Sequence, residues 1–331
     1  MNISDPRGDL SPDLLRATKT VVTHADCPDG IASALILHHV LPDAGVVFVE
    51  HNTPEHSDLP ASEGMLFCDI APPAARVQEF VEQGAIVLDH HRAARPVVEA
   101  FGDRGVFADE QADPGVSGAT LAYREVWRRL TSEDSPAVRR LALRAGVRDC
   151  WQRKHPEWSE ATAQAAALVF FGYDALVSDG ALSQGSASGA LSQGSASGAP
   201  EITETVQEVG RRLVRQRHDV ARVTAESKCF ALREDVWIYN DRDRLLSDVA
   251  QLVFDGHERV NLVAGFHYKV TSDGEMLLVY ALRSRQDTID VSTIAKANGG
   301  GGHRSAAGFS VPAETGNPLQ VLRDILTTAS V

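Results

Sequence analysis

The sequence holds few cysteines and no long apolar segment. Its four cysteines show no CxxC spacing, which argues against a zinc knuckle or a disulfide framework. No apolar run approaches the length of a membrane span, and residues 1–20 lack the apolar stretch of a signal peptide. We therefore expect a cytoplasmic protein with no membrane partner, whose thiols are buried or incidental.

Positive charge is also scarce. The chain has 32 Lys and Arg residues against 45 Asp and Glu residues, a net charge of −13. This balance disfavours long-range attraction to DNA or to an anionic membrane, so we expect no binding of long duplex nucleic acid. An acidic protein still binds phosphate locally where its carboxylates have first gathered cations.

The chain is long enough for two domains. It has 331 residues, 43% of them hydrophobic, and single cores usually stop growing below this length. The nonapeptide ALSQGSASG occurs twice in tandem, at Ala181–Gly189 and Ala190–Gly198, and its Gly and Ser content is typical of a flexible connector. We predict a first domain over residues 15–180, a linker or loop over 181–200 and a second domain over 201–331.

Short β-forming segments alternate with helical segments in the first domain. This alternation predicts an α/β fold with a mostly parallel sheet. The expected strands are Thr18–Thr23, Val46–Val49, Met65–Phe67 and Ala85–Leu88, and the expected helices are Ile31–Val40, Ala74–Glu82, Gly115–Leu130 (capped by Asp113-Pro114) and Pro136–Val147.

The second domain has the pattern of a smaller α/β unit. We expect a long helix first, then strands, a glycine-rich turn before a small-residue helix start, and a final helix. The predicted helices are Glu201–Arg222 and Leu319–Thr327, and the predicted strands are Cys229–Leu232, Val236–Tyr239, Asn261–Val270 and Met276–Leu282.

Polar residues follow three of the predicted strands of the first domain. His24 and Asp26 follow the first strand, Asp69 the third, and Asp89-His90-His91 the fourth. The carboxyl ends of parallel strands meet at one edge of a sheet, which is where sites form in such folds. Carboxylates mixed with imidazoles favour Mn²⁺, with Mg²⁺ as the second choice, because zinc usually takes thiolates or a closed set of histidines.

With these motifs the chain resembles the DHH phosphoesterases that carry a C-terminal DHHA1 domain. Asp89-His90-His91 matches the signature that names the family, and Asp69 and Asp149 match the single aspartates before and after it. Gly299–His303, followed by RSAAGF, is similar to the glycine-rich motif of DHHA1. The matches run from His24 to Phe309 in the expected order.

The resemblance implies a role for each matched residue, in a site held in a cleft between two domains. Asp69 would bridge two ions, Asp89 would orient His90, and His91 would contact the scissile phosphate. The implied metal ligands are His24, Asp26, Asp29, Asp69, His90 and Asp149. The implied substrate-binding residues are Arg283, Ser284, Gly300, Gly301, Gly302 and His303.

The first motif departs from the family pattern. Many members place two aspartates one residue apart, whereas Cys27-Pro28 separates Asp26 from Asp29 here. Either Asp26 reaches a metal from a reshaped turn, or Cys27 occupies that position and one metal site is altered.

The resemblance implies hydrolysis of short oligonucleotides or small nucleotides, such as cyclic dinucleotides or 3′-phosphoadenosine 5′-phosphate, with two Mn²⁺ ions. The sequence leaves two alternatives, an inorganic pyrophosphate or polyphosphate hydrolase and a nucleotide-binding sensor without turnover. It disfavours a RecJ-like exonuclease on long single strands, because the net charge gives no basic track for a long backbone. It also leaves open the base and length preference, the polarity of hydrolysis and whether the chain forms a homodimer.

Overall fold

The computed structural model describes residues 10–51, 53–132, 134–177, 191–193, 200–271, 274–285 and 288–328. Most of the tandem nonapeptide lies outside these residues, so its role as a linker stays a prediction. The chain divides into two compact units, Met1–Val214 and Arg215–Val331. The division falls within one long helix, α10 (Glu204–Ser227).

The first unit contains a five-stranded sheet in the order β2-β1-β3-β4-β5, and every pairing is parallel. This confirms the predicted α/β fold with a parallel sheet. The strands are β1 (Thr20–His24), β2 (Gly45–Val49), β3 (Met65–Cys68), β4 (Ile86–Asp89) and β5 (Gly105–Phe107). A separate two-stranded antiparallel sheet is formed by β6 (Leu191–Gln193) and β7 (Pro200–Ile202).

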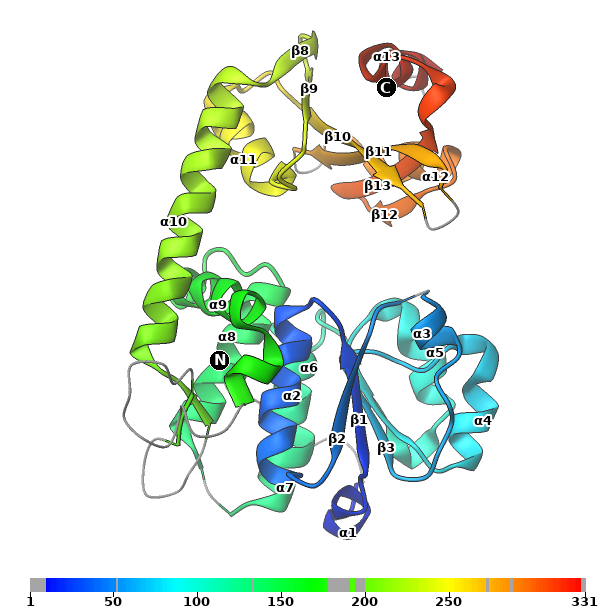
Figure 1. Cartoon of the computed structure of the whole chain (residues 1–331), viewed down its shortest axis with the longest axis vertical. Coiled ribbons are helices and arrows are strands. Elements are labelled where there is room, and N and C mark those ends of the chain that lie inside the picture. The colour runs from blue at the N-terminus through cyan, green and yellow to red at the C-terminus, as the bar shows by residue number, and fades with distance from the viewer. Residues whose placement is uncertain are drawn as a thin grey trace. The chain divides into compact units, whose positions relative to one another are not determined.

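Helices cover both faces of the parallel sheet (Figure 1). Alternate residues of the buried strands point to opposite faces. On β3, Leu66 packs into the cluster with α2 and α6, whereas Phe67 packs into the cluster with α4 and α5. The helices of this unit are α1 (Pro12–Arg16), α2 (Pro28–Val40), α3 (Pro54–Ser57), η1 (Ala74–Arg76), α4 (Val77–Glu82), η2 (Arg92–Ala94), α5 (Arg95–Glu99), η3 (Gly102–Arg104), α6 (Gly118–Leu121), the π-helix η4 (Ala122–Trp127), α7 (Arg128–Leu130), α8 (Pro136–Asp149) and α9 (Trp158–Val177, broken at Gly172).

The predicted cap at Asp113-Pro114 is wrong. The helix begins at Gly118, and Ser117 is its N-cap in a reciprocal capping box with Thr120. The Asp113 side chain instead accepts a hydrogen bond from the buried Arg124 at 2.6 Å. Aspartate is a favourable N-cap residue, but leaving the buried Arg124 guanidinium without a carboxylate would cost more free energy than the lost cap.

The second unit contains a mixed six-stranded sheet in the order β12-β13-β11-β10-β9-β8. Only the β9–β10 pairing is parallel among the described strands of this sheet. Helices α12 and α13 pack on one face and α11 on the other. The elements are β8 (Phe230–Arg233), β9 (Val236–Asn240), α11 (Leu246–Gly256), β10 (Leu262–Val270), β11 (Met276–Ser284), α12 (Val291–Ala297), β12 (Gly301–His303), β13 (Ala306–Pro312), η5 (Ala313–Thr315) and α13 (Pro318–Thr328).

The glycine-rich segment forms a strand rather than the turn before a helix that we expected. Gly301–His303 is β12, and it turns directly into β13, with which it pairs antiparallel. A Cβ at Gly300 or Gly302 would collide with residues of β13, whereas one at Gly301 would meet nothing within 4 Å. Close strand pairing therefore accounts for Gly300 and Gly302.

Within the part of the chain that the structure describes, no helix has both the length and the apolar character needed to cross a membrane.

Candidate functional site

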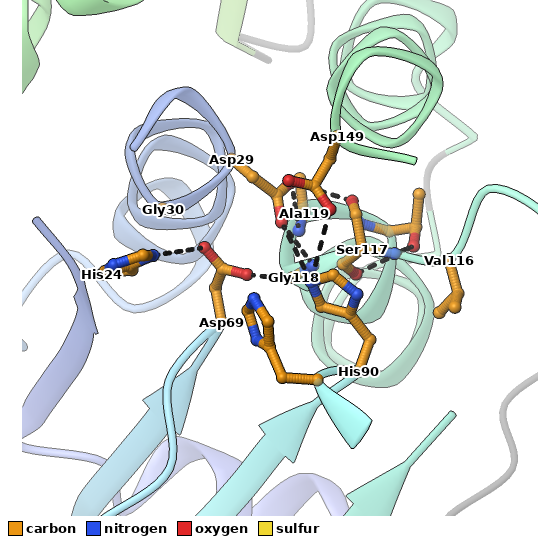
Figure 2. A network of polar contacts seen from close by, with 12 residues as sticks. His24, Asp29, Gly30, Asp69, His90, Val116, Ser117, Gly118, Ala119 and Asp149 are labelled. Carbon is orange, nitrogen blue, oxygen red and sulfur yellow. Dashed lines mark hydrogen bonds and ion pairs between the residues drawn. The ribbon is translucent and has the colours of Figure 1, made fainter. Parts of the chain in front are cut away.

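The carboxyl ends of β1, β3 and β4 bring the predicted polar residues together (Figure 2). His24 ends β1, Asp69 follows β3 and His90 follows β4. Asp29 lies in the first turn of α2, and Asp149 is the last residue of α8. All five side chains point into one small region, although they come from five elements of the chain.

His90 lies at the centre of the acidic groups. Its Nε2 atom is 3.2 Å from Asp69 Oδ1, 3.5 Å from Asp149 Oδ2 and 4.0 Å from Asp29 Oδ2. Two ligand atoms bound to one ion at about 2.1 Å each lie at most about 4.2 Å apart, so these separations fit a shared cation.

The N-terminus of α6 holds Asp29. The Ser117 hydroxyl and the Ala119 N–H donate to Asp29 Oδ1 at 2.8 and 3.1 Å, and the Gly118 N–H donates to Oδ2 at 2.6 Å. Backbone donors at a helix N-terminus favour an anion. The carboxylate of Asp29 is therefore fixed in place, and Ser117 acts on the site through it.

Burial and repulsion between carboxylates raise the pKa values of Asp69 and Asp149. Asp69 is 1% exposed, and burial together with Asp29 and Asp149 raises its pKa well above the usual range. Burial and Asp29 also raise the pKa of Asp149 to about 6. A cation among them would remove this repulsion.

Asp89 orients His91 and not the His90 ring that the resemblance implied. Asp89 Oδ1 accepts from the His91 Nδ1–H at 2.8 Å and from the backbone N–H groups of His90 and His91 at 2.7 and 2.9 Å. The hydrogen bond from His91 lowers the pKa of Asp89 against the effect of its burial. Because its Nδ1–H is used, His91 presents Nε2, and its side chain is 39% exposed.

Asp26 and Cys27, the two candidate ligands of the first motif, have different surroundings in the structure. Asp26 is exposed, in a turn with φ 51°, and belongs to no metal-capable group of described residues. Cys27, His24 and Asp69 form one such group, in which one ligand atom of each lies within 4.8 Å of the others. Burial and Asp69 raise the pKa of the Cys27 thiol.

Three groups of described residues offer ligand atoms for a divalent ion. Asp69 belongs to two of them and His90 to two. Two buried atoms in these groups, His24 Nδ1 and Asp69 Oδ2, have no hydrogen-bond partner. Buried polar atoms are rarely left unpaired, so the donor set fits metal ions. The groups are His24, Cys27 and Asp69; Asp69, His90 and His91; and Asp29, His90 and Asp149.

Two neighbours of the site escaped the sequence analysis. Glu50 accepts a hydrogen bond from His24 Nε2 at 3.3 Å. The only sequence feature that could have indicated Glu50 is its position directly after β2. The His51 ring lies 5.2 Å from that of His24 and 6.1 Å from that of His91, between centroids. Burial and the surrounding imidazoles lower the pKa of His51, which favours a neutral ring beside the metal ligands.

The second unit holds the predicted substrate-binding residues. Arg283 lies in β11, where its guanidinium donates to Ser247 Oγ at 3.2 Å and to the Leu282 carbonyl at 2.9 Å. Burial lowers the pKa of Arg283. Ser284 ends β11 and is 7% exposed, and His303 ends β12.

No family model matches the chain, and no curated protein matches it by sequence. Solved structures do match. The DHH domain of a member of the S1p family of ribosomal proteins aligns with 96% of this chain and 87% of its own, at 13% identity and a TM-score of 0.58. Exonuclease RecJ bound to manganese aligns with 99% of this chain and 96% of its own, at 16% identity and a TM-score of 0.57.

A third match is RecJ from Thermus thermophilus in complex with Mn²⁺, at 18% identity and a TM-score of 0.52. It aligns with 96% of this chain, which spans about half (53%) of that protein's length. The chain therefore shares the fold of these DHH-domain and RecJ structures, a parallel-sheet α/β unit followed by a smaller α/β unit, as the sequence motifs implied.

Proposed function

We propose that this chain is a metal-dependent phosphoesterase that hydrolyses short oligonucleotides or related small nucleotides, such as cyclic dinucleotides, to mononucleotides. The observation that carries the proposal is the sharing of Asp69 and His90 among metal-capable groups at the carboxyl edge of the sheet. The described fold is also that of RecJ, an exonuclease whose structure is bound to manganese.

The residues of the site divide the work between metal binding and contact with the phosphate. His24, Asp29, Asp69, His90 and Asp149 would hold two divalent ions, preferably Mn²⁺. Such ions neutralise phosphate charge and lower the pKa of a water molecule, so that it attacks phosphorus at neutral pH.

His91 is the group that would meet the substrate. Asp89 fixes its ring and its tautomer through the 2.8 Å hydrogen bond, which leaves Nε2 directed away from that carboxylate. A protonated His91 would donate from Nε2 to a phosphate oxygen, and the buried carboxylate of Asp89 would stabilise that charge. Both residues are catalytic in this proposal.

Recognition of the nucleotide falls to the second unit in this proposal. Arg283 offers a planar fork of N–H donors that suits a terminal phosphate. Gly301 lacks a steric reason to be glycine, and an open backbone at that position suits close approach of a ligand. Ser284, Gly300, Gly302 and His303 complete the proposed substrate-binding set.

The proposal is tested with the full chain stripped of metal. We expect no hydrolysis of bis-p-nitrophenyl phosphate or of a dinucleotide until Mn²⁺ is added, and weaker rescue by Mg²⁺, because mixed imidazole and carboxylate sites suit the softer ion. Asp149→Ala should lower the turnover by at least about a hundredfold, since even indirect partners of a metal cost 10–100-fold. Far-UV circular dichroism checks that this variant is folded.

Three other outcomes would contradict parts of the proposed function. Turnover of pyrophosphate or polyphosphate in preference to dinucleotides would replace the nucleotide substrate with an inorganic one. Tight nucleotide binding with no turnover under any metal would identify a sensor. Full activity after metal removal would refute the metal-dependent mechanism.

A further inference from the structure

One metal-capable group of this chain contains a sulfur ligand. His24, Cys27 and Asp69 offer a nitrogen, a thiol and a carboxylate oxygen within 4.8 Å of one another. Tetrahedral ligands at about 2.0–2.3 Å from an ion lie roughly 3.3–3.8 Å apart, so closing the group on an ion shortens these separations by about 1.5 Å at most. The group spans β1, α2 and the turn after β3.

The hydrogen bond to Glu50 decides which His24 nitrogen faces the group. A carboxylate only accepts, so the 3.3 Å contact with Glu50 Oε1 puts the ring proton on His24 Nε2. In the neutral ring, Nδ1 then carries a lone pair. Nδ1 faces Asp69 Oδ2 at 3.9 Å, and both atoms are buried without a hydrogen-bond partner (Figure 2). Two acceptors that face each other in this way repel, and a proton on Asp69 or a bound cation relieves that repulsion.

Cys27 is oriented to complete this pair. It occupies the N-cap position of α2 with β-region backbone angles, yet its side chain makes no capping hydrogen bond. Asp26, the alternative ligand, is exposed in the preceding turn.

A second metal-capable group differs in its chemistry. Asp29, His90 and Asp149 supply two carboxylates and one imidazole, a set that suits Mn²⁺ or Mg²⁺. Thiolates select softer ions such as Zn²⁺. Asp69 reaches both groups, since Oδ2 faces His24 and Oδ1 lies 3.2 Å from His90 Nε2.

We propose that the metal centre has two unequal positions, and that Cys27 makes the one with His24 and Asp69 selective for a thiophilic ion of the Zn²⁺ or Co²⁺ type. The second position remains an Mn²⁺ or Mg²⁺ site. This inference rests on the metal binding of the proposed function and refines it at one position, where Zn²⁺ or Co²⁺ would bind more tightly than the Mn²⁺ that fills both positions when it is the only ion supplied.

The test is a Co²⁺ titration of the metal-stripped full chain, followed by near-ultraviolet absorption and without any substrate. We expect a sulfur-to-cobalt charge-transfer band that Zn²⁺ abolishes by competition and Mn²⁺ does not. Cys27→Ser and Cys27→Asp should both remove the band. In a competition assay with a chromophoric chelator, Cys27→Asp should weaken Zn²⁺ binding at least about tenfold while preserving Mn²⁺ binding.

Cys150→Ser is the matched control. Cys150 is also half-buried and near Asp149, but its Sγ donates to the Val116 carbonyl and belongs to no metal-capable group of described residues. This variant should keep the band. A wild-type protein without the band, or a band that survives in a folded Cys27→Ser chain, would overturn the inference. Because the band needs no turnover, a catalytically inert protein that shows it would refute the proposed activity and leave the thiolate site standing.

Discussion

Asp29 and Asp26 lie three positions apart in one motif, yet their surroundings differ. Asp29 is 1% exposed and accepts hydrogen bonds from Ser117, Gly118 and Ala119, whereas Asp26 is exposed in a turn. Asp29→Ala removes a proposed metal ligand and leaves the N-terminus of α6 without its anion. We expect its specificity constant to fall by about a hundredfold or more, and that of Asp26→Ala to change by less than about threefold.

Steady-state kinetics with saturating Mn²⁺ measures both variants. The order of the two effects is the decisive result, because a larger loss in Asp26→Ala would mean that the exposed residue moves onto the metal. Ser117→Ala serves as the control for loss of a hydrogen bond alone. It keeps the Asp29 carboxylate and both backbone donors, so its loss of activity should lie between the other two.

At the same scale, the sequence predicted which polar residues converge at the site, but not which partners their side chains take. His24, Asp29, Asp69, His90 and Asp149 converge because each stands at the end of a strand or helix, which short-range patterns locate. Whether Asp89 bonds to the ring of His90 or to that of His91 depends on side-chain geometry, which cannot be read from the spacing of residues in the sequence. Glu50 and Ser117 reach the site only through tertiary contacts.

At the scale of elements, the approach of α6 to the turn after β3 decides whether the site forms. A Cβ on Gly118 would overlap the Asp69 side chain and lie 3.0 Å from Asp29 Oδ2. Gly118→Ala should therefore displace a shared ligand and lower turnover by at least about a hundredfold. Gly45→Ala is a matched control, since its Cβ would lie 4.0 Å from the Lys19 carbonyl and fit without a shift.

Metal binding measured by calorimetry distinguishes the reason for the loss in Gly118→Ala. We expect weaker Mn²⁺ binding in this variant and wild-type binding in Gly45→Ala. Wild-type affinity and turnover in Gly118→Ala would mean that α6 moves freely away from β3, contrary to the packing described above.

The errors in predicting elements have physical causes too. The apolar strands β1 to β4 were located from sequence within one or two residues, and for β1, β3 and β4 the reason is that burial on both faces requires continuous β-branched and aliphatic runs. The helix start was misplaced to Asp113 because the sequence does not reveal the buried Arg124 that binds this carboxylate. The strand β12 was missed because glycines carry no β signal, and only the pairing with β13 explains them.

At the scale of the molecule, we expect chemistry and recognition to separate between the two units. Arg283→Ala should weaken hydrolysis of a dinucleotide much more than that of bis-p-nitrophenyl phosphate, which has no distant phosphate. Loss of one charge-assisted contact costs roughly 1.5–3 kcal/mol, or about ten- to a hundredfold in the specificity constant. Arg259→Ala, on an exposed arginine of the same unit, should change neither. Equal losses on both substrates in Arg283→Ala would assign Arg283 to the chemical step.

The stability of the metal-free protein should fall as the pH rises across the acidic range. Asp149 has a folded pKa of about 6 against an ordinary 3.8, and the pKa of Asp69 is also raised. Between these values the folded state binds more protons than the unfolded state, so the free energy of unfolding decreases as the pH rises. The lowered pKa of His51 acts in the opposite sense below pH 6.5, and that of Asp89 does so only at more acidic pH, so we expect the two raised carboxyl groups to dominate.

Metal bound by these carboxylates would remove this cost, because they would be ionised and their mutual repulsion compensated. An excess of Mn²⁺ about a hundredfold above its dissociation constant adds roughly 2.7 kcal/mol to stability. Since metal must displace protons from these carboxyl groups, we expect the increase in Tm on adding Mn²⁺ to be clearly larger at pH 7.5 than at pH 5. Asp149→Asn should flatten the pH dependence of the metal-free protein and reduce the metal effect. An equal increase in Tm at both pH values would show that the raised pKa values play no part in metal binding.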